Sequence, residues 1–145
     1  MLALHTRQRT LFCCNHPMPT VKTFFRGLLG VFFVAAGINH FWHSAFYVAM
    51  MPPYLPLHTQ LVVASGLAEI GLGALVLVHR WQQLAGWGLV ALSVAVFPAN
   101  LHMALHPDLF TQFTPVGLWL RLPLQIVAIG WIVWCTQLGR RTGKV

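Results

Sequence analysis

Four long apolar stretches dominate this chain of 145 residues and limit what it can fold into. A helix needs roughly 17–25 mainly apolar residues to cross a bilayer, and each stretch reaches about that length. None of them alternates apolar and polar residues as the strands of a membrane barrel do, and a helix satisfies its own backbone in lipid. The sequence therefore predicts an all-α, polytopic membrane protein, a four-transmembrane-helix bundle. Its predicted spans are Phe24–Trp42, Leu61–Val78, Leu84–Leu105 and Val116–Leu138.

The lysines and arginines lie on alternate sides of these spans and predict the orientation of the chain. Lys22 and Arg26 stand at the start of the first span, Arg80 lies between the second and third, and further basic residues follow the fourth. The loops Ser44–Gln60 and His106–Pro115 contain neither residue type. Because cytoplasmic loops carry the excess of positive charge, both termini are predicted to be cytoplasmic, in a bacterial-type inner membrane. Charges confined to membrane edges also argue against a nucleic-acid partner.

The chain divides into three predicted parts. Residues 1–22 form a cytoplasmic N-terminal extension, expected to be flexible, and their apolar content is too low for a secretory signal. Residues 23–139 form the four-helix domain, whose main partner is the lipid bilayer. Residues 140–145 form a basic cytoplasmic tail expected to contact anionic lipid. The three cysteines form no CxxC pair, so no disulfide scaffold is expected.

Polar residues within the spans gather toward the predicted outer surface. Glu69, one of only two carboxylates in the chain, falls roughly 12 Å below that surface at the rise of a helix, and Asn100 roughly 8 Å below it. The inner halves of the same spans are almost purely apolar. Polar groups in a membrane bundle face one another rather than lipid, so these side chains are predicted to line one site. The candidate ligand-binding residues are Asn39, His40, Glu69, Asn100, His102, Arg121 and Gln125.

Arg121 is the predicted partner of Glu69, because a guanidinium stays protonated and matches the shape of a carboxylate. Such a buried ion pair can fix helix register, or it can belong to a functional pocket, and both interpretations remain open. Pro98 and Pro123 interrupt helical hydrogen bonds at the same depth and favour a cavity over a solid core. The small residues predicted to let helices approach closely are Gly27, Gly30, Gly37, Ser65, Gly66 and Gly73.

The histidines provide no recognisable metal site. His40 with His43, and His102 with His106, have helical spacing, but neither HExxH nor CxxCH accompanies them. We therefore expect no metal and no nucleotide, and the cofactor stays unknown, with a quinone as one candidate.

Five short motifs follow one another in a specific order. They are Gly37–Phe41 (GINHF), Met51–Pro56 (MPPYLP), Ser65–Glu69, Phe97–Asn100 (FPAN) and Arg121–Gln125 (RLPLQ). In this order, over about residues 20–138, they resemble the DoxX-like family of small four-helix membrane proteins, in its MPPYLP and FPAN branch. The family takes its name from a subunit of a thiosulfate:quinone oxidoreductase, and other members are linked to redox and thiol-stress complexes. The resemblance thus implies a four-helix fold in a membrane redox system.

These observations lead to four functional hypotheses. The first is a subunit that binds a small hydrophobic ligand, quinone-like or lipid, or serves as an accessory to a membrane redox system, with a separate redox partner protein. The second is a membrane enzyme that uses Glu69 as acid or base. The third is a structural or assembly protein without a ligand. The fourth is a transporter of a small solute, for which four spans are few; a homo-oligomer would be compatible with it.

Overall fold

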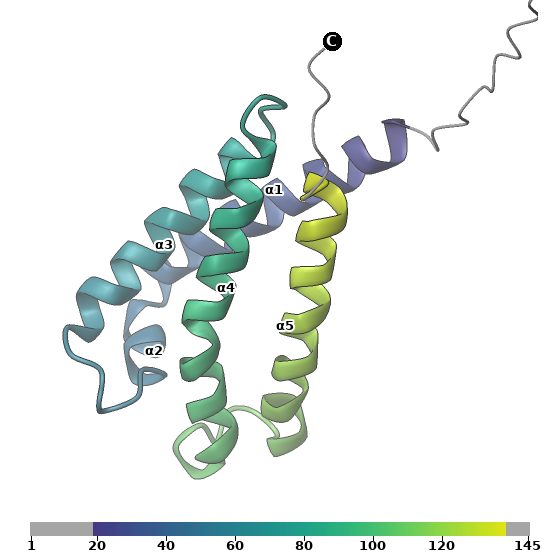
Figure 1. Ribbon diagram of the computed structural model, residues 1–145. Helices are drawn as coiled ribbons and strands as arrows, with labels where there is room; N and C mark the ends of the chain where they lie inside the picture. Colours follow the sequence, from purple (N-terminus) through teal and green to yellow (C-terminus); the bar gives the residue numbers. More distant parts are fainter. Residues whose placement is uncertain (1–18, 139–145) are drawn as a thin grey trace, which may run out of the picture.

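Every regular element of the computed structural model, which describes residues 19–138, is a helix (Figure 1). The elements in chain order are α1 (Pro19–Trp42), α2 (Ser44–Ala49), α3 (His58–Leu75), α4 (Gln82–Leu105), the short 3-10 helix η1 (Pro107–Leu109) and α5 (Pro115–Thr136). The predicted all-α class is confirmed for these residues. The predicted basic tail and the N-terminal extension as far as residue 18 lie outside the described residues.

Three of the helices are long and apolar enough to cross a membrane. They are Val21–Trp42 within α1, Gln82–Leu105 (α4) and Pro115–Thr136 (α5). Each exposes large apolar side chains, among them Phe32, Val94 and Ile126, the last 70% exposed. Apolar surface of this extent needs an apolar surrounding. By length, composition and exposed surface, the chain is a membrane protein.

The second predicted span differs from the helix that the structure contains. Leu61–Val78 was the expected range, whereas α3 begins earlier, at His58, and ends earlier, at Leu75. Its first turn is polar and Glu69 lies in its middle, so α3 is not among the helices apolar enough to span. The structure thus contains three helices that could cross a membrane, and the predicted four-helix transmembrane bundle is not confirmed.

Glycines bring α1 and α3 into backbone contact, as their spacing predicted. A methyl group on Gly30 would lie 2.8 Å from the carbonyl oxygen of Gly73, and one on Gly37 would lie 2.5 Å from that of Gly66. No side chain fits at either crossing, and small residues are what allows helices in membranes to approach this closely. Gly27 was expected to act in the same way, but it faces open space.

The loop predicted over Ser44–Gln60 contains the helix α2. Its residues Phe46 and Tyr47 are partly buried against other apolar side chains of the same end of the molecule. The helix stops before the two consecutive prolines Pro52 and Pro53, which lack the N–H that would continue it. The prolines are evident in the sequence, whereas the helical turn before them was not predicted.

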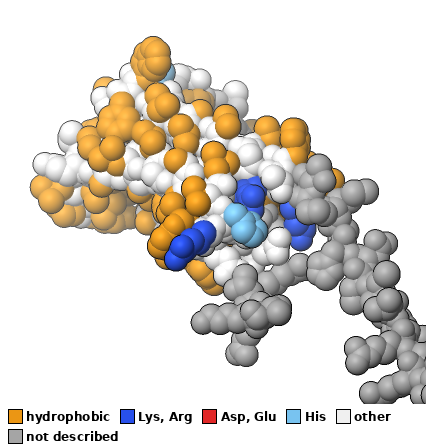
Figure 2. Space-filling view, turned by 90° about the horizontal axis from the view of Figure 1, so that it is seen from above, with side chains coloured by type: hydrophobic (Ala, Val, Ile, Leu, Met, Phe, Trp, Pro, Cys, Tyr) orange, Lys and Arg blue, Asp and Glu red, His pale blue; other side chains and the backbone are white. Residues whose placement is uncertain are grey.

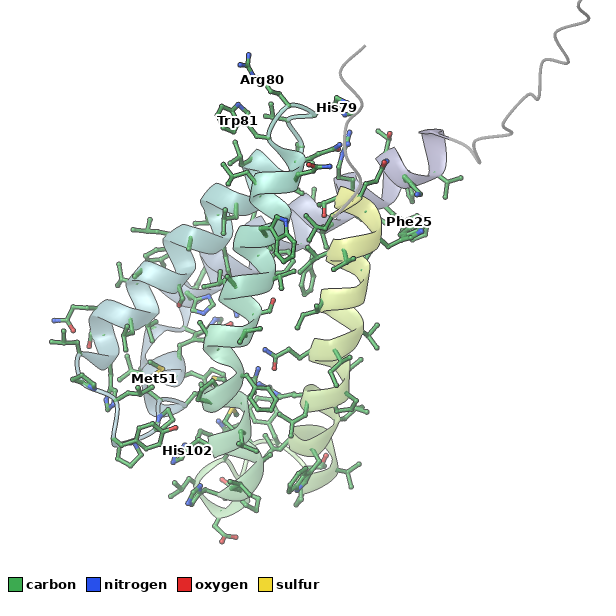
Figure 3. The ribbon with its side chains drawn as sticks, in the orientation of Figure 1. Phe25, Met51, His79, Arg80, Trp81 and His102 are labelled. Atoms are coloured by element: carbon green, nitrogen blue, oxygen red, sulfur yellow. The ribbon has the colours of Figure 1, made fainter. Side chains whose placement is uncertain are left out.

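The two ends of the molecule differ in charge. The start of α1, the turn between α3 and α4 and the end of α5 lie together at one end, whereas α2 and η1 lie at the other (Figure 1). Basic side chains gather at the first end (Figure 2), which we call the basic end; there Lys22 lies over the ring of Trp134 and Arg26 donates a hydrogen bond to Gln82. Arg80 lies at this end too, with Met51 and His102 toward the opposite one, the α2 end (Figure 3).

Two separate groups of buried apolar side chains hold the helices together. The basic-end cluster consists of Leu29, Phe33, Val76, Ala85, Leu89, Ile132 and Cys135. The α2-end cluster consists of Met50, Met103, Ala104, Phe110 and Leu118. Along α4 and α5, the polar residues Ser93, Asn100 and Gln125 lie between residues of the two clusters.

Candidate functional site

A buried imidazole–carboxylate pair joins α1 to α3. His40 and Glu69 are each only 8% exposed, and Nδ1 of His40 lies 3.2 Å from Oε2 of Glu69. The two residues meet because Gly37 and Gly66, one turn away from them, let the backbones of the two helices touch. On its other side, the His40 ring stacks on Tyr47 of α2 at 3.8 Å between ring centroids.

One oxygen of this pair lacks a hydrogen bond. Nδ1–H of His40 is directed at the carbonyl oxygen of Ala36, 3.0 Å away, and one N–H cannot serve two acceptors at full strength. Oε2 of Glu69 therefore has no hydrogen-bond partner within residues 19–138, although it is buried. A buried acceptor left unpaired costs roughly 1–3 kcal/mol, and more if it is charged. Such an atom is suited to accept a hydrogen bond from a bound molecule.

Arg121 does not form the ion pair that the sequence predicted. The one ion pair among the described residues is that of Glu69 with His40. The guanidinium of Arg121 instead lies over the ring of Phe113, 4.6 Å from its centroid, and its Nη1 lies 3.7 Å from Sδ of Met103. A thioether is a weak acceptor, so most of the five N–H donors of the guanidinium remain available. The physical reason for the difference is competition: His40, one turn beyond the glycine contact, already occupies the space beside the carboxylate.

Two amide side chains connect α4 and α5 near the His40–Glu69 pair. Asn100 Nδ2 donates to Oε1 of Gln125 at 3.3 Å, and Gln125 Nε2 donates to the carbonyl oxygen of Ser93. That carbonyl lies one residue before Val94, whose carbonyl Pro98 was predicted to free from its helical donor. The acceptor is therefore not the carbonyl that Pro98 frees, and the predicted polar contact of that carbonyl stays a prediction.

The pair, the guanidinium and the amides share connected cavities. A cavity of about 200 Å³ is lined by His40, Glu69, Asn100 and Arg121, together with Tyr47 and apolar residues. A neighbouring cavity of about 280 Å³ shares Glu69, Asn100 and Arg121 and adds Gln125 and Ser93. Few polar groups converging in an apolar surrounding are typical of small-molecule sites.

Two of the seven predicted residues lie away from these cavities. Asn39 is exposed, donates to the hydroxyl of Tyr47 at 2.9 Å and accepts from Nδ1 of His43 at 2.8 Å. His102 packs against the rings of His106 and Phe110 near η1 (Figure 3). The structure therefore brings together five of the predicted residues, namely His40, Glu69, Asn100, Arg121 and Gln125.

Sequence reasoning missed the aromatic wall of the cavity. Tyr47 lies on α2, which was interpreted as a loop. The candidate residues were chosen as polar residues within the predicted spans, and a tyrosine near a membrane surface does not stand out in that way. The available signal was the spacing of His43 and Tyr47, four residues apart, which places both on one face of a helical turn. Met50 and Met51 line the same cavity. Their position beside the prolines was only a weak sequence signal for that role.

Apolar helices that enclose a buried polar cavity define a helical membrane protein with a candidate ligand site. The chain belongs to the family described as Domain of unknown function (DUF8561), whose family model matches residues 29–136. That range runs from within α1 to the end of α5 and so includes every residue of the cavities described above. No curated protein and no solved structure matches the chain. The resemblance to the DoxX-like family stays a prediction.

Proposed function

We propose that the chain is a DoxX-like membrane subunit that binds a small amphiphilic ligand, quinone-like or lipid, with the polar head of the ligand beside Glu69. The observation that carries the proposal is the buried, unpartnered Oε2 of Glu69 in a cavity that Arg121 also lines. A structural ion pair would satisfy both groups at once. Here Oε2 of Glu69 and the guanidinium of Arg121 line the same cavity; the oxygen lies 3.2 Å from Nδ1 of His40 without a hydrogen bond, and the guanidinium contacts a thioether and an aromatic ring.

The chemistry of the head group follows from these two residues. A hydroxyl or N–H of the ligand would donate to Glu69, and a carbonyl, hydroxyl or phosphoryl oxygen would accept from Arg121. Asn100 supplies both functions beside them. A molecule with a donor and an acceptor on one compact head fits this arrangement, as a quinol or a glycerolipid would. The cavity volume of about 200 Å³ suits a head of that size.

The proposal includes a membrane topology. α3 would be the fourth crossing, because α1 and α4 are long enough to span and α3 runs beside both, between α2 and the turn at the basic end (Figure 1). Its 18 residues correspond to roughly 27 Å of helix, close to the thickness of a hydrocarbon core. The basic end, with Lys22, Arg26 and Arg80, would be cytoplasmic in a bacterial-type inner membrane. The cavities would then lie in the outer leaflet.

The redox part of the proposal depends on the DoxX-like resemblance. In it, the chain binds or presents the ligand, and a separate partner protein carries out electron transfer. An assembly of several copies is compatible with the exposed apolar helix faces, but lipid covers such faces equally well.

The test is to identify small molecules that copurify with the protein from its own membrane. Wild type and the variants Glu69→Gln and Arg121→Gln would be extracted with native lipid, and bound molecules would be quantified by native mass spectrometry and lipid extraction. We expect a molecule near one per chain on wild type, reduced at least about tenfold in both variants, because each loses a charge-assisted hydrogen bond. Asp108→Asn is the matched control, since Asp108 is the other carboxylate and is exposed on η1. An empty wild-type protein, or equal occupancy in Glu69→Gln, would overturn the proposal.

A second candidate function is acid–base catalysis by His40 and Glu69. Their 3.2 Å separation favours it, because an imidazole beside a carboxylate can accept a proton from a bound hydroxyl and pass it on. The two functions differ in what His40→Gln should do. It would abolish turnover of the copurified molecule and retain its binding if the pair is catalytic, whereas binding and any activity would fall together if the pair only holds the head group.

A further inference from the structure

A third cavity opens between α3 and α4 toward the α2 end. It has a volume of about 420 Å³, and its walls are almost entirely apolar. The one polar side chain in its walls is Ser65, whose hydroxyl donates to the carbonyl oxygen of Val62 in its own helix. Pockets for small molecules in proteins have roughly this volume, about 300–1,000 Å³. It carries no group that would orient a polar ligand.

Four alanines create this cavity. Ala64 and Ala68 lie one turn apart on α3, and Ala95 and Ala99 lie one turn apart on α4. A helix pair lined by methyl groups leaves room that longer side chains would fill. The same two helices close toward the basic end, where Leu72 packs so near to Gly88 that a methyl group on that glycine would lie 2.7 Å from it. We call the space lined by the four alanines, Met51 and Leu55 the alanine groove.

The alanine groove adjoins the polar cavity. Both are lined by Met51, Ser65, Val96 and Ala99, so one side of the groove lies against the space that holds the unpartnered oxygen of Glu69. The other side reaches the surface of the helix pair, because Ala64 and Ala95 are exposed. The surface there faces the apolar surrounding of the helices rather than the α2 end, where the α2-end cluster is closed and buried.

We propose, resting on the function proposed above, that the ligand carries a single hydrocarbon chain, which lies in the alanine groove while its polar head lies beside Glu69. An apolar channel that begins at a polar site and ends at the lipid-facing surface has the shape of such an amphiphile. A compact ligand without a chain would leave the groove empty, and a molecule with two chains would not fit between one pair of helices. The four alanines are thus specificity residues for the chain of the ligand.

The test compares probes with and without a chain. The probes are a benzoquinol with a ten-carbon alkyl substituent and the same ring with a methyl group, and then monodecanoylglycerol and glycerol. Binding to the protein in lipid nanodiscs would be measured against empty nanodiscs. The groove variants are Ala64→Leu and Ala95→Leu, which change exposed positions and so leave the packed core untouched. The matched controls are Ala74→Leu on α3 and Ala91→Leu on α4, which are exposed and lie outside the groove.

We expect the groove variants to weaken binding of a long-chain probe at least about tenfold, because excluding even two methylene groups from an apolar site has that effect. They should leave the short-chain probe within about twofold, and the controls should resemble wild type. Glu69→Gln should weaken both members of a pair. If the groove variants weaken both members equally, or leave the long-chain probe unchanged while Glu69→Gln weakens it, the inference is overturned and the head site stands. If neither long-chain probe binds to wild type above empty nanodiscs, both proposals are overturned.

Discussion

The two halves of the bundle use the same helices in opposite ways. Toward the basic end, α1 meets α3 through Gly30 and Gly73, and Leu72 of α3 fills the space over Gly88 of α4. Toward the α2 end, α3 and α4 face each other through alanines and leave about 420 Å³ unfilled. The α3–α4 contact is thus close in one half and open in the other, whereas α1 and α3 meet closely in both halves, through Gly30 and Gly73 and through Gly37 and Gly66.

The halves also differ in how their polar groups are satisfied. In the packed half, Thr136 is buried and its hydroxyl donates to the carbonyl oxygen of Ile132, one turn back in the same helix, whereas the neutral Nε1–H of Trp131 is buried without an acceptor among residues 19–138. At the cavity, Glu69 keeps an unpartnered oxygen and Arg121 contacts only an aromatic ring and a thioether. Natural proteins depart from full satisfaction mainly where function requires it. The charged side chains with the weakest partners thus lie in the α2-end half, where we propose that the ligand binds.

The largest effect is expected from a methyl group added in the packed half. Gly30→Ala would place it 2.8 Å from the carbonyl oxygen of Gly73, where the backbone cannot yield without separating α1 from α3. Overpacking of this kind costs about 1–3 kcal/mol, and we expect the upper end. The free energy of unfolding would be measured by titration with SDS in mixed micelles, followed by helical circular dichroism.

Gly27→Ala on the same helix is the control for that prediction. Gly27 faces open space, so the substitution should be neutral or slightly stabilising, as alanine has the higher helix propensity. Equal losses of stability in the two variants would mean that the α1–α3 contact is looser than the structure has it, and the contrast between the halves would weaken.

The next effect separates the two members of the buried pair. His40→Ala leaves the Glu69 carboxylate without its nearby imidazole and should lower the free energy of unfolding by about 2 kcal/mol. Glu69→Gln removes a charge whose oxygen has no hydrogen bond, so its stability should stay within about 0.5 kcal/mol of wild type or rise. Adding Glu69→Gln to His40→Ala should recover part of the loss. A loss in Glu69→Gln as large as that in His40→Ala would show that the carboxylate is a structural group.

The sequence predicted the helices well and the partners within the site less well. The helices follow from long apolar runs, and the closeness of α1 and α3 follows from glycine spacing. Both signals can be recognised within a short segment of the sequence. The partner of Glu69 is not a local property of the sequence: it depends on the crossing of α1 over α3 at Gly37 and Gly66, which places His40 beside the carboxylate.

The alanine groove could not be predicted for a similar reason. Alanines in a membrane helix are as compatible with close packing as with a cavity, and the difference depends on how far apart two helix axes lie. The glycine contact draws α3 toward α1, and on its other face α3 is left against α4 with only alanines between. Composition fixes the size of the side chains but not this distance.

A smaller effect is expected from the amides that join α4 and α5. Asn100→Leu and Gln125→Leu each remove the hydrogen bond between these side chains, and the second also removes the bond to the Ser93 carbonyl. Hydrogen bonds between membrane helices contribute about 0.6 kcal/mol on average, so each variant should lose about 1 kcal/mol or less. Their losses should be less than additive in the double variant. Gln112→Leu, in the exposed loop before α5, is the matched control and should lose nothing; a fully additive double variant would contradict the bond.

The smallest effect is the coupling between Glu69 and Arg121, and it tests the contrast between the two halves of the bundle most directly. Because Arg121 contacts Phe113 and Met103 rather than the carboxylate, the stability changes of Glu69→Gln and Arg121→Gln should add to within about 0.5 kcal/mol. Arg121→Gln and Phe113→Leu should instead couple by about 0.5–1 kcal/mol, the magnitude of a cation–π contact. Both cycles would be measured by the same SDS titration. Coupling above about 1 kcal/mol in the first cycle would mean that the guanidinium reaches Glu69 in lipid. The cavity would then hold a satisfied structural ion pair, and the hollow half would have no unpartnered groups with which to bind a ligand.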